Sequence, residues 1–308
     1  MPTRKPIRLK TITEAHQLSG LANPEHPLIS IVDYTDLQSS TSNNVDINQG
    51  LLLDFYYITL KKGFKNKLYY GQQTYDFDEG MLYFVAPNQL IRGAGASPED
   101  DLSGWILLVH PDLLWGTSLA SKIKNYEFFN YAINEALFLS DKERTIINDI
   151  IKHIRIEYFS NIDRFSQDII VSHLETLLTY AERFYQRQFI TRKINNHQIL
   201  ARLEELLSDY FNDEELSTKG LPTVQYISKS LHISQSYLRG LLKSLTGQTT
   251  QQLIHEKLID KAKEKLSTTE LTVSEIAYEL GFEHSQSFNK LFKAKTNQSP
   301  LEFRASFN

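Results

Sequence analysis

The chain contains no cysteine, and its 308 residues include only two Met and two Trp. Without thiols it forms no disulfide, carries out no thiol catalysis and binds no zinc through cysteine. Long apolar runs are also missing, since no stretch approaches the roughly 18 residues of a membrane span. The N-terminus lacks the run of roughly 7 to 15 apolar residues found in signal peptides. We therefore expect a cytoplasmic protein without a membrane partner.

Sequence motifs of several enzyme classes are absent as well. There is no Gly-x-Ser-x-Gly, no His-Glu-x-x-His and no Walker-type phosphate loop. Between residues 45 and 110 the only histidine is His110, whereas a transition metal needs several nitrogen or oxygen ligands. We therefore expect a protein that is not an enzyme, with no catalytic residue, no bound metal and no cofactor.

The C-terminal part of the chain contains an internal repeat. Ile227 and Ile276 are 49 residues apart, whereas Leu238 and Phe288 are 50 apart. Further pairs at these spacings are Leu231 with Leu280, Ile233 with Phe282, Leu242 with Phe292, Lys243 with Lys293, and Thr246 with Thr296. The pattern predicts two similar units in tandem that differ by one residue in a turn.

Each unit has the pattern of a helix, a tight turn and a second helix. In the second unit, Thr272 and Glu275 have the spacing of a capping box at a helix start. Gly281 follows where a left-handed residue ends that helix at little steric cost. Between the units, a stretch that contains the apolar residues Leu253 to Leu266 predicts one linking helix of about 17 residues, or roughly 25 Å. This length predicts that the second helices of the two units lie about one DNA turn apart, roughly 34 Å.

The second helix of each unit presents polar side chains outward. Arg, Lys, Gln, Asn and Ser pair with base edges and phosphate oxygens in a major groove. Any surface helix is polar outside, but two copies in register favour a DNA-reading role. The predicted base readers are Ser236 and Arg239 in the first unit and Ser285, Gln286, Asn289 and Lys290 in the second, and the predicted phosphate contacts are Lys243, Ser287 and Lys293.

Further residues complete a family pattern: Ile276-Ala277, Gly281-Phe282, Ser287-Phe288, Phe292-Lys293, Ser299-Pro300, Phe303, Arg304 and the earlier Thr246-Gly247. With them, residues 217–308 resemble the DNA-binding domain of the AraC/XylS family of bacterial transcription regulators. The resemblance implies a seven-helix domain whose two recognition helices enter successive major grooves of double-stranded DNA. It also implies RNA polymerase as a partner if the protein is an activator. Gly240 stands where many relatives carry a long polar or basic side chain, so we expect the first recognition helix to read fewer bases.

The distribution of charge agrees with a nucleic-acid partner at this end. Residues 217–308 contain 12 Lys and Arg against 8 Asp and Glu, a net charge of +4, in a chain whose net charge is −4. Residues 1–216 therefore carry −8. This modest basic excess predicts DNA affinity that depends on a few phosphate contacts and falls with salt.

The first part of the chain predicts a regulatory domain at residues 1–115. Alternating apolar and polar residues between 45 and 110, separated by glycines, favour a small antiparallel β-barrel or sandwich. The resemblance implies a cupin-like sensing barrel here. Ordinary core residues are one reading of its aromatic side chains, and a small-molecule effector pocket is the other. For the pocket, the candidate residues are Tyr56, Tyr70, Tyr75 and Trp105.

Residues 116–215 predict a helical region between this barrel and the all-α domain of residues 216–308. Two amphipathic stripes, at 146–158 and 169–185, predict a helical hairpin, followed by a hinge near 187–196. The stripes bury either against the barrel or against a second copy, and the resemblance favours a homodimer.

The predicted fold class is therefore α+β: a cupin-like barrel, a helical dimerisation hairpin and a domain with two helix-turn-helix units. The predicted function is an effector-controlled regulator, more often an activator in this family. A regulator whose barrel is purely structural remains the alternative.

Overall fold

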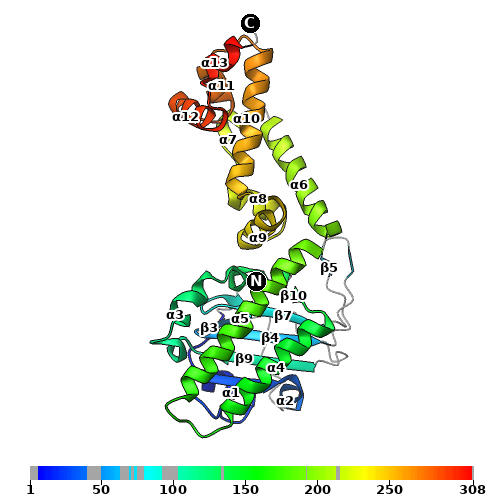
Figure 1. Cartoon of the computed structure of the whole chain (residues 1–308), viewed down its shortest axis with the longest axis vertical. Helices are drawn as coiled ribbons and strands as arrows, with labels where there is room; N and C mark the ends of the chain where they lie inside the picture. The colour runs from blue at the N-terminus through cyan, green and yellow to red at the C-terminus, as the bar shows by residue number, and fades with distance from the viewer. Residues whose placement is uncertain are drawn as a thin grey trace. The chain divides into compact units, whose positions relative to one another are not determined.

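The computed structural model of the chain describes residues 6–39, 50–62, 69–70, 73–74, 80–91, 103–132, 135–191, 193–212 and 216–306. These residues divide into two compact units, Met1–Gln188 and Phe189–Asn308 (Figure 1). The finer division at residues 115 and 215 stays a prediction. Among the described residues, no helix is both long and apolar enough to cross a membrane.

The first unit is built around an antiparallel sheet with the strand order β10-β7-β4-β9-β2. Its strands are β2 (Ile29–Asp33), β4 (Tyr56–Lys62), β7 (Met81–Val85), β9 (Ser103–Val109) and β10 (Leu137–Phe138). A second sheet joins β1 (Ile7–Leu9), β3 (Leu51–Leu53) and β8 (Leu90–Ile91), and β5 (Tyr69–Tyr70) pairs with β6 (Gln73–Thr74). The described strands thus confirm a sheet-rich N-terminal region.

The barrel itself is not confirmed, because the described strands form separate sheets and no closed ring. Helices cover one face of the larger sheet (Figure 1). On the other face lies an apolar cluster that brings β1 and β3 of the second sheet against β9 of the first. Its buried members are Leu9, Ile12, Tyr34, Leu53, Phe55, Ile106 and Leu108.

Two long helices, α4 (Asp141–Tyr158) and α5 (Ser166–Thr191), lie across the larger sheet (Figure 1). A capping box between Ser140 and Glu143 starts α4. The indole Nε1 of Trp105 on β9 donates to Asn148 Oδ1 on α4 at 3.0 Å. The predicted apolar stripes are therefore buried against the sheet of the same chain, and the dimerisation role of the hairpin is not confirmed.

The remaining helices of the first unit are short. They are α1 (Ile12–Leu18), α2 (Tyr34–Ser39) and α3 (Leu119–Lys122), with the 3-10 helices η3 (Pro111–Leu114), η4 (Ile123–Asn125) and η5 (Glu127–Asn130).

The second unit is helical throughout its described residues. After α6 (Lys193–Asn212), residues 216–306 form the seven helices α7 (Leu216–Lys219), α8 (Val224–Ser230), α9 (Gln235–Thr246), α10 (Thr250–Thr268), α11 (Val273–Glu279), α12 (Ser285–Thr296) and α13 (Pro300–Ala305). The predicted linking helix is α10, which runs for 19 residues from a capping box at Thr249. The predicted hinge at 187–196 is helical in its described part, because α5 continues to Thr191 and α6 begins at Lys193, and the boundary between the two compact units falls within it. Its role as a hinge stays a prediction.

Candidate nucleic-acid interface

The two repeats have the same turn geometry. His232 after α8 and Gly281 after α11 are 49 residues apart, and both have positive φ angles, +58° and +82°. The turn then ends at Ser234 in the first unit and at His284 in the second, which are 50 residues apart. The one-residue difference therefore lies in the turn, as the changing spacing predicts.

The second helices of the two units, α9 and α12, are each 12 residues long. Each ends at a left-handed residue, Gly247 (φ +71°) and Asn297 (φ +61°), whose amide donates to Lys243 O and Lys293 O respectively. Asn adopts this conformation more readily than most side chains. The two units therefore present recognition helices of equal length.

Buried apolar residues fix the inner side of each recognition helix. On α9 these are Leu238, Leu241 and Leu242, all with no exposed surface. On α12 the rings of Phe288 and Phe292 are fully buried, and Phe292 packs edge-on against Phe303 of α13 at 5.6 Å. With these side chains inside, helix geometry directs the polar residues outward.

The structure gathers the predicted DNA contacts on these outward faces. On α12 the exposed residues are Gln286, Ser287, Asn289, Lys290 and Lys293, while Ser285 is half-buried. On α9, Arg239 and Lys243 are exposed and Ser236 is half-buried. Gln286, Asn289, Lys290 and Lys293 have the spacing i, i+3, i+4 and i+7, and so form one stripe.

Gly240 of α9 does not lie on an open surface. It is buried in the structure, although it is four residues after Ser236 and three before Lys243 and therefore lies on their side of the helix. From the sequence, the missing side chain of Gly240 was expected only to reduce the number of bases that α9 reads. Its burial was not predicted.

Other residues of the family pattern are structural. Arg304 of α13 donates from Nε to Leu266 O at 3.2 Å, in the last turn of α10. A cation near a helix C-terminus is favourable because the helix dipole is negative there. Arg304 therefore holds α13 to the linking helix.

Lysines of the linking helix pair with carboxylates. Lys261 Nζ lies 2.9 Å from Glu264 Oε2, and Lys265 Nζ lies 2.7 Å from Glu279 Oε2. Nearby, burial and the charge of Lys295 lower the pKa of His255, so its imidazole adds no positive charge near pH 7. Part of the basic charge of this unit is thus offset on α10.

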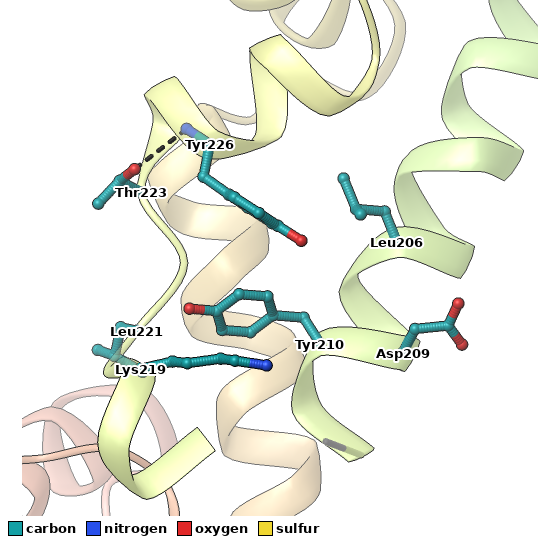
Figure 2. Close-up of a pocket in the computed structure, with 7 residues that line it drawn as sticks. All are labelled: Leu206, Asp209, Tyr210, Lys219, Leu221, Thr223 and Tyr226. Atoms are coloured by element: carbon teal, nitrogen blue, oxygen red, sulfur yellow. Dashed lines mark hydrogen bonds between the residues drawn. The ribbon is translucent and has the colours of Figure 1, made fainter. Parts of the chain in front are cut away.

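A pocket of about 500 Å³ lies beside α8, the first helix of the first helix-turn-helix unit (Figure 2). Tyr210 of α6 and Tyr226 of α8 face one another there, with ring centroids 5.1 Å apart. The Tyr210 hydroxyl also donates to Gly220 O at 3.0 Å. The end of α6 is therefore fixed to the segment that precedes α8.

In the N-terminal compact unit, Met1–Gln188, the structure brings two of the four predicted effector residues to one face of the larger sheet. Tyr56 and Trp105 both face the helices, and Tyr56 contacts Phe129 of η5 with ring centroids 5.0 Å apart. Trp105 also lines a pocket of about 400 Å³ with Asp33 of β2 and Arg155 of α4. Tyr70 lies in β5, where side chains are outside the description, and Tyr75 lies outside the described residues.

The opposite sheet face carries a tyrosine cluster that the sequence did not single out as a set: Tyr34, Tyr57 and Tyr83. The Tyr34 hydroxyl lies 3.0 Å from Thr59 Oγ1, and the rings of Tyr57 and Tyr83 are 6.0 Å apart. Burial raises the pKa of all three phenols, so they stay protonated. Tyr56 and Tyr57 are adjacent in sequence, and only the strand register shows which face each one takes.

Comparison with known proteins places the C-terminal repeat in a family. Residues 227–306 match the model of a helix-turn-helix domain. An uncharacterised HTH-type transcriptional regulator of Pseudoalteromonas carrageenovora is 34% identical over 116 residues, which are 38% of this chain and 64% of that protein. The regulatory protein SoxS of Salmonella typhimurium is 25% identical over 111 residues, 36% of this chain and 97% of SoxS.

Among solved structures, the C-terminal domain of the two-component response regulator yesN from Fusobacterium nucleatum is 29% identical, with a TM-score of 0.30. The match covers 34% of this chain and 95% of that one. The repeat of residues 227–306 is an AraC-type helix-turn-helix domain, and its relatives are transcriptional regulators of the AraC family.

Proposed function

We propose that the protein is a cytoplasmic, sequence-specific regulator of transcription that binds double-stranded DNA through α9 and α12. The observation that carries this proposal is a pair of helices of equal length in one domain. Each buries its apolar side in the domain core and turns its polar side outward. Base readers are Ser236, Arg239, Ser285, Gln286, Asn289 and Lys290, and phosphate contacts are Lys243, Ser287 and Lys293. Activation through RNA polymerase is the proposed outcome of binding.

The experiment that tests this function recovers bound fragments of DNA from the source organism. The full-length protein is compared with a Gln286→Ala, Lys290→Ala double variant under the same salt conditions. A shared motif that is enriched by the first and lost with the second supports the proposal. Equal recovery of all fragments by both proteins contradicts it.

The proposal extends to a small-molecule effector in the N-terminal unit. The pocket between the sheet and α4 combines the indole of Trp105 with an ion pair, in which Arg155 donates to both oxygens of Asp33 at 2.6 and 2.7 Å. Apolar walls with a few polar groups are typical of ligand sites.

Trp105 fluorescence tests for this effector. The only other tryptophan is Trp115, which is 80% exposed, so a Trp115→Phe variant isolates the Trp105 signal. Binding of a library member is expected to change that emission and the DNA affinity together. No change across a metabolite library, with DNA binding intact, favours the alternative of a structural domain.

Homodimerisation is proposed to occur through the end of the helical hairpin. Five large apolar residues are exposed between residues 156 and 169: Ile156, Phe159, Ile162, Phe165 and Ile169. We call this set the α4–α5 patch. Exposed apolar residues grouped in one short segment are more typical of protein contacts than of free surface.

A further inference from the structure

The internal repeat offers a direct comparison of the two recognition helices. At the spacing of 50 residues, Tyr237 of α9 corresponds to Ser287 of α12, and Gly240 corresponds to Lys290. Ser287 and Lys290 are exposed, whereas Tyr237 is 5% exposed and Gly240 is buried. The same part of the helix surface is therefore open on α12 and covered on α9.

Helix geometry shows that this cover lies outside the domain core. Successive residues turn by about 100°, which places the core side of α9 around Leu238, Leu241 and Leu242. Gly240 lies on the other side, between Ser236 and Lys243. Because glycine has no side chain, the low exposure of Gly240 on this polar face means that surrounding atoms cover its backbone.

The segment that reaches this part of α9 is the junction of α5 and α6, defined as residues 189–191 and 193–196. The ring of Phe189 lies edge-on to Tyr237, with centroids 5.1 Å apart, and Phe189 is only 1% exposed. The side-chain amide of Asn196 donates to Phe189 O, which joins the end of α5 to the beginning of α6. Tyr237 is three residues before Gly240, so the two positions are neighbours on the helix surface.

We propose that this junction is an autoinhibitory cover of the first recognition helix, an inference that rests on the proposed DNA-binding function. A recognition helix lies in a major groove only about 12 Å wide. A segment packed against α9 at Tyr237, the position of exposed Ser287 on α12, therefore occupies space that DNA needs, and α9 enters the groove only after Phe189 leaves Tyr237. The measured affinity then falls with the fraction of molecules in which α9 is open.

The chain also contains a route for control of this cover. Helix α5 begins at Ser166 in the N-terminal compact unit, and its last residues, from Phe189, belong to the C-terminal compact unit. A change in the N-terminal compact unit that displaces α5 moves Phe189 directly. The opposite end of α6 stays fixed near α8 through Tyr210, so that opening is confined to the junction.

The first test removes the contact from each side. Phe189→Ala and Tyr237→Ser, which introduces the residue type of the second helix-turn-helix unit, are both expected to bind a duplex carrying the selected motif about fivefold more tightly, because an aromatic contact of this kind is worth about 1 kcal/mol beyond the area buried. Ile190→Ala is the matched control, because Ile190 is the next residue and is 54% exposed. Unchanged or weaker binding by both variants, with native circular dichroism, overturns the proposal.

The second test locks the contact. The chain has no cysteine, so a Phe189→Cys, Tyr237→Cys variant can be joined selectively by a short bismaleimide. Cross-linking is expected to weaken binding to the same duplex at least tenfold relative to the uncross-linked variant, and equal binding overturns the cover. Failure of the wild type and all variants to select any DNA motif would instead reject the DNA-binding function itself.

Discussion

Gln286 and Arg239 represent the two recognition helices at the scale of single residues. Gln286 is exposed at the start of α12, next to Asn289 and Lys290 on the same stripe. Arg239 is exposed on α9, but the residue after it is Gly240 and contributes no side chain. We therefore expect α12 to supply most of the base discrimination and α9 to position the domain.

This difference predicts unequal effects of alanine substitution. Gln286→Ala is expected to cost about 1–3 kcal/mol on the selected motif and to relax preference at one base position, as for loss of a bidentate base contact. Arg239→Ala is expected to change sequence preference less. Selection from a random duplex pool with each variant measures this, and an equal loss of preference with Arg239→Ala would contradict the assignment.

Lys293 is predicted to act through charge alone. Lys293→Ala should weaken binding to all sequences similarly and reduce the slope of log affinity against log salt by about 1. Lys295→Ala is the matched control, because it removes the same charge from the same helix at an exposed position of the last turn, on the side opposite the polar stripe. Equal slopes for the two variants would show that Lys293 does not contact a phosphate.

At the scale of elements, the turn at Gly281 joins the second helix-turn-helix unit to the start of the domain. A Cβ at Gly281 would lie 3.0 Å from Gly220 Cα and from Leu216 O, and the residue has φ +82°. At Gly247 the φ is +71°, but nothing lies within 4 Å of the added carbon. The two glycines thus separate steric crowding from backbone conformation.

We predict that Gly281→Ala destabilises the protein more than Gly247→Ala. The first combines a left-handed alanine with a backbone clash and is expected to cost about 2–3 kcal/mol, and the second about 1 kcal/mol. Urea unfolding monitored by circular dichroism measures both. Equal losses would mean that α7 moves away from Gly281 without cost.

Local patterns predicted the helices of the second unit well because their ends are determined by nearby residues. The Thr272 capping box and Gly281 confine α11, and both are visible in the sequence. The sheet faces were harder, since Tyr56 and Tyr57 differ only in register. The burial of Tyr237 against Phe189 was not predictable, because Phe189 lies more than forty residues earlier in the chain.

At the scale of the whole molecule, the helical hairpin has two sides with different roles. Its inner stripes pack on the sheet, so they are not available to a second copy. The α4–α5 patch remains exposed at the end of the hairpin, with Phe159 63% and Ile162 62% exposed. A dimer through this patch would leave the inner stripes in place.

Charge substitution in the patch is predicted to abolish the dimer. Phe159→Glu with Ile162→Glu should elute as a monomer at micromolar concentration, because burying two carboxylates in an apolar contact is costly. The wild type should elute as a dimer. A monomeric wild type, both with and without DNA, would contradict dimerisation through any surface.

The central claim is that α9 and α12 bind successive major grooves of one DNA site. A hydroxyl-radical footprint on the selected motif tests it most directly. The account predicts two protected segments on one face of the duplex, about 10 base pairs apart, with the segment bound by α12 lost in the Gln286→Ala, Lys290→Ala variant. A single protected segment, or a pattern unchanged in the variant, would contradict it.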